Sequence, residues 1–215
     1  MLTRRDTLRT TALTTALVAG SSVLPLTGAA LAQTVDIPKL MEQGSLPDKI
    51  VGEDSAPVTI IEYASMTCPH CATFHTDVYP QLKEKYVDTG KVRFVFREFP
   101  LDRLAAAASM LARCVEDDKF FPFIDVLFRE QGNWVSRDPI EPLKKLSKQA
   151  GLSEEAFDKC LANQELLDGV VWIKDRATEE FQVRSTPTFF VNGQLVRGGQ
   201  SIDEFEEIID GFIGG

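Results

Sequence analysis

Two runs of strand length, separated by a helical pattern, follow residue 57. The run "VTIIEYA" (58–64) is rich in β-branched residues, and "VRFVFREF" (92–99) alternates apolar and arginine positions as a strand does. Between them, Val78, Leu82 and Tyr86 recur at helical spacing. The three segments therefore predict a βαβ unit, which is right-handed and has parallel strands.

The pattern is helical from residue 101 to about 181, where apolar stripes repeat every three or four positions. Strand character returns in "TPTFFVNGQLVRGG" (186–199), and Asn192-Gly193 within it predicts a tight hairpin turn. A last apolar stripe follows the S-x-x-E sequence at 201–204, which is a helix capping box. The chain therefore ends as a hairpin followed by a helix.

This order of elements predicts an α/β protein and looks like a thioredoxin fold with an inserted helical domain. We expect one thioredoxin-like domain over residues 33–215, with the helical insertion at about 101–165 between its βαβ half and its ββα half. The segment 33–56 contains several prolines and glycines, which interrupt helices and strands, and Ile50-Val51 within it is a candidate edge strand.

Residues 1–32 have the pattern of an export signal peptide. A basic head with Arg4, Arg5 and Arg9 precedes a stretch without charge, and "ALA" at 30–32 is a small-x-small cleavage sequence. An uncleaved membrane anchor is the alternative, although the apolar stretch is short and interrupted. "TRRDTLR" also resembles a twin-arginine signal, so the export route stays open. We expect cleavage after Ala32 and a periplasmic location.

Composition narrows the class of function. The chain has 215 residues, of which 44% are hydrophobic and 26% charged, as expected of a globular domain with a sizeable core. The net charge of −9 argues against nucleic-acid binding, because the phosphate backbone would repel it. All four cysteines follow the predicted signal, so they would face an oxidising compartment in which disulfides persist.

The stretch "TCPHCATFH" (67–75) joins the first strand to the following helix. Cys68 is expected at the helix cap, Pro69 suits the first helical position, and Cys71 lies one turn further on. The positive end of the helix and a protonated His70 would both lower the pKa of the Cys68 thiol. A stabilised thiolate stabilises the reduced form, so the Cys68–Cys71 disulfide would be a strong oxidant.

Metal binding is one alternative for this cluster, and an inert structural disulfide is another. Ligand identity permits zinc, because cysteine and histidine are both zinc ligands; the candidates are Cys68, Cys71, His70 and His75. A structural zinc site normally takes its second ligand pair from a separate segment, however. Cys114 and Cys160 are far apart in the sequence and do not form such a pair. The pattern favours thiol redox chemistry, with no metal and no organic cofactor.

Three stretches together resemble the DsbA family of periplasmic thiol oxidases, in particular its alphaproteobacterial branch. They are "APVTIIEYASMTCPHCATFH", "FVFREFPLD" and "STPTFFVNG", and the resemblance extends over residues 50–212. It implies an enzyme that donates the Cys68–Cys71 disulfide to reduced, newly exported proteins. It also implies that a DsbB-like quinone-linked membrane oxidase reoxidises the Cys68–Cys71 pair of the enzyme.

The resemblance also assigns residues away from the cysteines. Pro187 matches a cis-proline opposite the cysteine pair, and the amide of Thr186 would pair with an extended substrate backbone. An ordinary trans turn proline is the alternative. Glu62 matches an acidic position under the active site, where it would tune Cys71 or shuttle its proton; the alternative is a solvated strand residue.

The resemblance further implies a second, structural disulfide between Cys114 and Cys160, since some family members carry one in the helical domain. Two free buried thiols are the alternative.

A disulfide isomerase or reductase of the same fold would share every catalytic residue, and Thr186 weakly favours this alternative function. A non-enzymatic metal-binding or redox-sensing protein is a third possibility. The segment 33–57 is too short and irregular for a dimerisation domain, so we expect a monomer.

Overall fold

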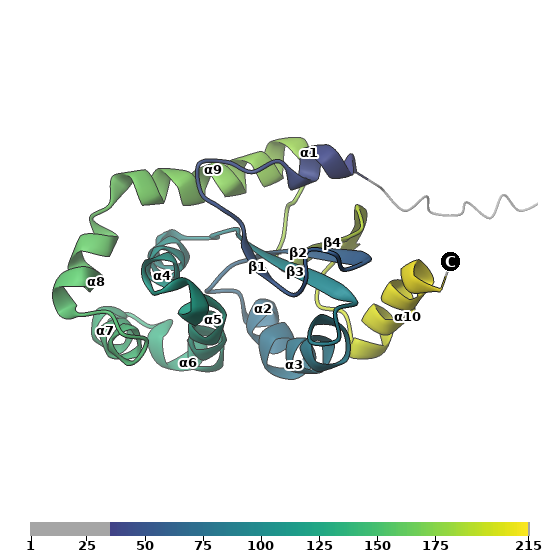
Figure 1. Ribbon diagram of the computed structural model, residues 1–215. Coiled ribbons are helices and arrows are strands. Elements are labelled where there is room, and N and C mark those ends of the chain that lie inside the picture. Colours follow the sequence, from purple (N-terminus) through teal and green to yellow (C-terminus); the bar gives the residue numbers. More distant parts are fainter. Residues whose placement is uncertain (1–34, 215) are drawn as a thin grey trace, which may run out of the picture. The chain divides into compact units, whose positions relative to one another are not determined.

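A five-stranded mixed sheet forms the centre of residues 35–214, the part of the chain that this computed structural model describes (Figure 1). The strand order is β1-β3-β2-β4-β5. Strands β2 and β3 are parallel, and the other neighbours are antiparallel. The strands are β1 (Lys49–Val51), β2 (Val58–Ala64), β3 (Val92–Glu98), β4 (Thr188–Val191) and β5 (Gln194–Arg197). The predicted parallel βαβ unit and the short edge strand at Ile50-Val51 are both confirmed.

The predicted export signal over residues 1–32 lies outside the described residues. Among residues 35–214, no helix combines the length and the apolar character needed to cross a membrane.

The crossover between β2 and β3 is one helical segment in four parts. They are α2 (Pro69–Thr73), the π-helical η1 (Phe74–Val78), α3 (Tyr79–Leu82) and the π-helical η2 (Lys83–Val87). Pro80 lies in the first turn of α3 and has no N–H to donate to the preceding turn. Wider π turns on either side accommodate this break.

The block between β3 and β4 is helical, as the sequence predicts. Its elements are α4 (Arg103–Cys114), the 3₁₀ turn η3 (Asp117–Lys119), α5 (Phe120–Arg129), α6 (Gln131–Trp134), α7 (Ile140–Gln149), α8 (Glu154–Leu161) and α9 (Gln164–Glu180). The final helix α10 (Ile202–Ile213) starts at the predicted capping box, in which Ser201 and Glu204 bond each other's backbone. The predicted hairpin turn is also present, with positive φ at Asn192 and Gly193.

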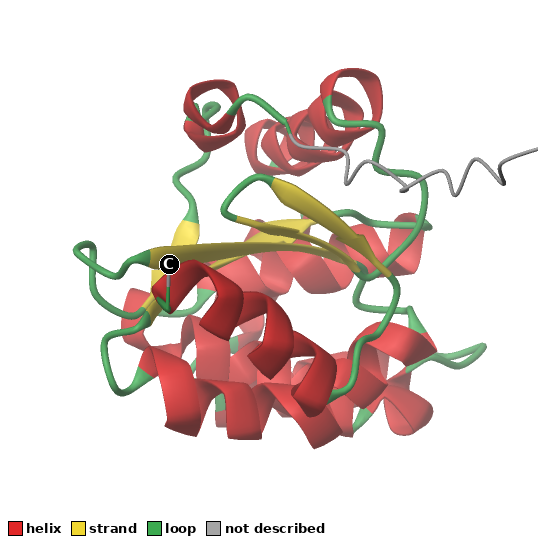
Figure 2. Ribbon diagram, turned by 90° about the vertical axis from the view of Figure 1, so that its right-hand side faces the viewer, coloured by secondary structure: helices red, strands yellow, loops and turns green. Residues whose placement is uncertain are grey.

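Helices cover both faces of the sheet (Figure 2). Helix α9 and the short α1 (Ile37–Met41) lie along one face, and α2, α3 and α10 lie along the other (Figure 1). Alternation along β2 divides its side chains between two cores: Ile61 and Tyr63 pack on the α9 side, and Ile60 packs on the α2 side. Glu62 shares the parity of Ile60, which places it on the α2 side as well.

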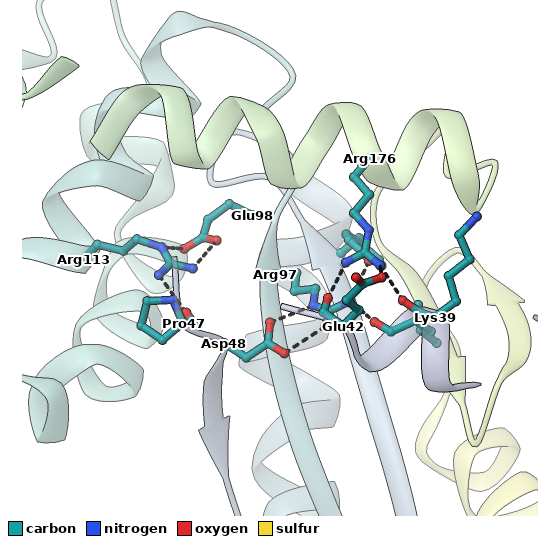
Figure 3. A network of polar contacts seen from close by, with 10 residues as sticks. Lys39, Glu42, Pro47, Asp48, Arg97, Glu98, Arg113 and Arg176 are labelled. Carbon is teal, nitrogen blue, oxygen red and sulfur yellow. Dashed lines mark hydrogen bonds and ion pairs between the residues drawn. The ribbon is translucent and has the colours of Figure 1, made fainter. Parts of the chain in front are cut away.

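The segment from α1 to β1 is held by three arginines, and we call residues 36–48 the strap (Figure 3). Arg97 of β3 binds both carboxylate oxygens of Asp48 and the carbonyl of Leu40. Arg113 of α4 donates to the Pro47 carbonyl. Arg176 of α9 donates to backbone carbonyls of the strap, those of Lys39 and Glu42. The strap, which contains the short helix α1 and no strand, is thus fixed by charged hydrogen bonds rather than by sheet pairing.

Cys114 at the end of α4 and Cys160 in α8 form a disulfide with a sequence separation of 46 residues. The alternative of two free thiols is therefore wrong. The bond ties two helices of the insertion together beneath the surface, because Cys160 is buried.

Replacing both cysteines of this bond by alanine should lower the free energy of unfolding by about 3 kcal/mol, because the unfolded chain regains the freedom of the closed loop. Urea denaturation of the oxidised proteins measures the difference. An unchanged denaturation midpoint would contradict a stabilising role.

Candidate active site

Cys68 lies where β2 gives way to α2. It is the N-cap of α2, with extended backbone angles, and Pro69 follows in the first turn, as the sequence predicts. The backbone N–H of Cys68 donates to the Ser65 carbonyl at 3.0 Å. These local bonds place the Cys68 sulfur beside the unpaired amides at the start of the helix.

The loop before β4 closes the other side of the cysteine pair. The Thr186-Pro187 peptide bond is cis, so the alternative of a trans turn proline is wrong. The Sγ of Cys68 lies 3.3 Å from the Thr186 carbonyl oxygen. The structure thus brings together Cys68 and the cis-proline loop across 118 residues of sequence.

The pKa of Cys68 is lowered to about 5. The largest cause is a hydrogen bond with the Cys71 thiol; Thr186 contributes another, and the backbone N–H groups of Cys71 and His70 add to them. Burial opposes the shift but is outweighed. His70 thus lowers the pKa of Cys68 through its backbone N–H. Its imidazole is exposed, and an effect of the charge of this ring on Cys68 stays a prediction from the sequence.

The pKa of Cys71 is shifted in the opposite direction from that of Cys68, although both side chains are buried. Cys71 is completely buried, and this burial is the main reason that its pKa lies well above the ordinary value for a thiol. The hydrogen bond to Cys68 and the negative charge of Glu62 raise the pKa of Cys71 further. At neutral pH the free thiols are therefore one thiolate and one protonated thiol, the arrangement needed for an attacking and a protected cysteine.

Glu62 is fully buried, so the alternative of a solvated strand residue is wrong. Its Oε2 is 2.9 Å from Nε2 of His75, and Nδ1 of His75 is 3.2 Å from Oδ1 of Asp125 on α5. Burial raises the pKa of Glu62, and the neighbouring His75 works against that shift. Burial alone would lower the pKa of His75, but the two carboxylates outweigh it and raise it to about 9.

Sequence reasoning considered His75 only as a zinc ligand. Both of its ring nitrogens instead contact carboxylates, and His70 is exposed on the surface. Across residues 35–214 no group of three or more metal-ligating side chains is placed to hold an ion. The four-residue separation of Cys71 and His75 could have indicated that His75 lies on the buried side of the active site, since residues four positions apart share one face of a helix.

The helical insertion also contacts the cysteine loop directly. Gln131 of α6 donates from Nε2 to the carbonyls of Met66 and Cys68, at 2.8 and 3.0 Å. Thr67 donates to Asp102, the N-cap residue of α4, at 2.7 Å. Neither contact has a local sequence signal, because the partners are 63 and 35 residues apart. The insertion therefore holds the loop that carries Cys68.

The chain is similar to known proteins over most of its length. The model of a family described as thioredoxin matches residues 45–211. A putative protein-disulfide oxidoreductase of Rickettsia bellii is 36% identical over 165 residues, which are 76% of this chain and 63% of the relative. A probable disulfide bond formation protein D of Bacillus cereus is 32% identical over 168 residues, which are 74% of this chain and 76% of the relative.

Among solved structures, the crystal structure of alpha-DsbA1 from Wolbachia pipientis is similar, with a TM-score of 0.76 and 32% identity. The similarity covers 82% of this chain and 95% of the Wolbachia chain. The chain spans about three fifths of the length of the rickettsial relatives.

Proposed function

Since the chain belongs to the thioredoxin-like family of DsbA-type disulfide oxidoreductases, we propose that it is a thiol:disulfide oxidoreductase that donates its Cys68–Cys71 disulfide to reduced exported proteins. The observation that carries the proposal is the contrast between two thiols one helical turn apart. The pKa of Cys68 is lowered to about 5, and that of Cys71 is raised. Such a pair favours its reduced form and therefore gives up its disulfide readily.

The reaction takes place in two exchanges. A substrate thiolate attacks Sγ of Cys68, the Cys68–Cys71 bond breaks, and Cys71 leaves with the electron pair and takes up a proton. A second substrate thiolate then attacks the substrate sulfur of the mixed disulfide, and Cys68 leaves as a thiolate. The substrate loses two electrons and the protein gains them. The low pKa of Cys68 makes it the better leaving group in the second exchange.

Substrate binding in this proposal uses the loop before β4. The Thr186 carbonyl, which precedes the cis bond to Pro187, lies against the Cys68 sulfur, so an extended peptide paired with the backbone of Thr186 would bring its own sulfur to Cys68. Glu62 is the buried acid that exchanges a proton with Cys71, and a protonated imidazole of His70 would add positive charge beside the Cys68 thiolate.

The location and partners are part of the same proposal. An export signal over residues 1–32 would deliver residues 33–215 to the periplasm as a monomeric thioredoxin-like domain with its helical insertion at about 101–165. A DsbB-like, quinone-linked membrane oxidase would accept the two electrons and restore the disulfide. The reaction itself needs no metal and no organic cofactor.

A trapping experiment tests the proposal. The Cys71→Ala variant, incubated with a client protein that contains scrambled disulfides, should accumulate a mixed disulfide through Cys68, because the thiol that would release it is missing. Non-reducing electrophoresis detects the adduct. Cys68→Ala should form none, and the variant without Cys114 and Cys160 should react like the parent chain.

Client refolding distinguishes an oxidase from the isomerase alternative. The oxidised protein should convert a reduced client to its disulfide form in stoichiometric amounts within minutes, and it should unscramble a misoxidised client much more slowly. If the oxidised parent chain leaves reduced clients unchanged, the proposed function is wrong. Efficient unscrambling with slow oxidation would assign the chain to the isomerases.

A further inference from the structure

Three side chains connect the buried side of the active site with the surface of the helical insertion. Glu62 of β2 is hydrogen-bonded to His75, and His75 is hydrogen-bonded in turn to Asp125 of α5. The side chains of Glu62 and His75 have no exposed surface, whereas that of Asp125 is 30% exposed. The line thus begins in the core and ends in solvent.

The line runs through an apolar surrounding. The His75 ring stacks on Phe128 with centroids 4.4 Å apart, and Phe74, Phe96 and Tyr79 pack around its other sides. The titratable groups that interact with Glu62 and His75 are Cys68 and Cys71 at the start of α2 and Asp125 of α5, and the Tyr79 ring of α3 packs on His75. The phenyl rings of Phe74, Phe96 and Phe128 have no group that exchanges a proton, so the hydrogen-bonded line is the polar route through these side chains.

A role in stability explains this cluster poorly. A buried ion pair is often no more stabilising than apolar residues of the same volume, because both charges lose their hydration. In addition, Oε1 of Glu62 is buried and has no hydrogen-bond partner among the described residues, which is unfavourable in a purely structural network. Oε1 is thus the carboxylate oxygen of Glu62 that His75 does not occupy.

We propose that His75 and Asp125 form a relay that exchanges the proton of Cys71, through Glu62, with solvent on the surface of the helical insertion. This inference rests on the proposed function, in which Cys71 gains a proton each time the disulfide is given up and loses it each time the disulfide is restored.

The proton is balanced at each step. When the Cys68–Cys71 bond breaks, the Glu62 carboxylate receives a proton on Oε2 from the His75 imidazolium, and the protonated Glu62 carboxyl passes a proton to the Cys71 thiolate. His75 then takes a proton from water by way of Asp125. Restoring the disulfide reverses the sequence, so Glu62 accepts the proton and Asp125 releases it. The raised pKa of His75, about 9, keeps the imidazolium available at neutral pH.

The test measures closure of the Cys68–Cys71 disulfide from a mixed disulfide of Cys68 with glutathione. Closure requires that Cys71 lose its proton, so it reports on the relay, whereas alkylation of Cys68 does not. Asp125→Ala should slow closure about tenfold at pH 7, less than the hundredfold or more expected for removal of a directly acting base. Sodium formate, a small carboxylate, should restore much of the rate, and sodium chloride at the same ionic strength should not.

Asp77→Ala is the matched control, because Asp77 is an exposed acid two positions from His75. It should close at the rate of the parent chain. If Asp125→Ala also closes at that rate across the pH range, or is slowed without rescue by formate, the relay is wrong. If the parent mixed disulfide itself fails to close, the proposed function fails instead.

A measurement on the unaltered protein keeps the proposal testable even if the variant does not fold. Nitrogen NMR of His75 in the reduced protein should show both ring nitrogens protonated at pH 7, because the relay requires an imidazolium between the two carboxylates. A neutral His75 ring at pH 7 would overturn the proposal.

Discussion

In the reduced protein, the Cys68 thiol should be half ionised near pH 5, as followed by the ultraviolet absorbance of the thiolate. The cause is the set of hydrogen bonds from Cys71, Thr186 and the first amides of α2, which lower the pKa of Cys68 to about 5. At pH 6 about 90% of Cys68 would then be thiolate, compared with about 0.3% of a thiol with the ordinary pKa of about 8.5. The fraction of thiolate at pH 6 is therefore expected to be several hundred times that of an ordinary thiol.

Variants identify the source of this absorbance. Cys68→Ser should remove the transition, and Cys71→Ala should move it to higher pH, because the strongest hydrogen bond is lost. His70→Ala separates the contribution of the imidazole from that of the His70 N–H, which the variant keeps; we expect a smaller upward shift of the Cys68 pKa. Absence of any thiolate signal below pH 7 would contradict the assignment of Cys68 as the reactive cysteine.

The same pKa makes the stability of the reduced protein depend on pH. The folded-state pKa of Cys68 lies below its unfolded value, so this stabilisation is fully present above about pH 9 and is lost as the pH falls through about 5. The oxidised protein has no such ionisation, whereas His75 is present in both forms. The melting temperature of the reduced protein should therefore exceed that of the oxidised protein at pH 7, and the difference should shrink towards pH 5.

Features with a local physical cause could be predicted from the sequence. The runs at 58–64 and 92–99 became β2 and β3 with nearly the same bounds, because β-branched content and alternation describe the strand itself. Asn192-Gly193 and the capping box at 201–204 act over four residues or fewer, and both formed as expected. Pro69 fixed the start of α2 in the same way.

Features that depend on distant contacts could not be predicted. Asp125 lies in a strongly apolar helix, and nothing within a few positions indicates that it meets His75 from 50 residues away. Gln131 likewise has an ordinary local environment, yet it binds the carbonyl of Cys68. The burial of Glu62 was undetermined, because alternation along a strand shows which residues share a face but not which face is covered on both sides of a sheet.

Asp48→Ala should lower the free energy of unfolding by about 3 to 5 kcal/mol, because it leaves a buried guanidinium without its counter-charge. The side chains of Asp48 and Arg97 are 6% and 5% exposed, and both carboxylate oxygens accept from Arg97 at 2.8 Å. The carbonyl of Leu40 and the hydroxyl of Tyr63 would remain as partners of Arg97, but neither carries a charge to balance it. Urea denaturation at pH 7 measures the loss.

Two comparisons separate the burial of the charge from the mere loss of an ion pair. Asp54→Ala removes the partner of Arg93 at a site where the carboxylate is 91% exposed, so no measurable change is expected. The double variant Asp48→Ala, Arg97→Met should be more stable than Asp48→Ala alone, because it removes the uncompensated charge together with its partner. If Asp48→Ala and Asp54→Ala change the free energy of unfolding equally, the buried ion pair of Asp48 and Arg97 does not stabilise the strap. If the double variant is no more stable than the single one, the loss arises from the contacts of Asp48 rather than from the unpaired guanidinium.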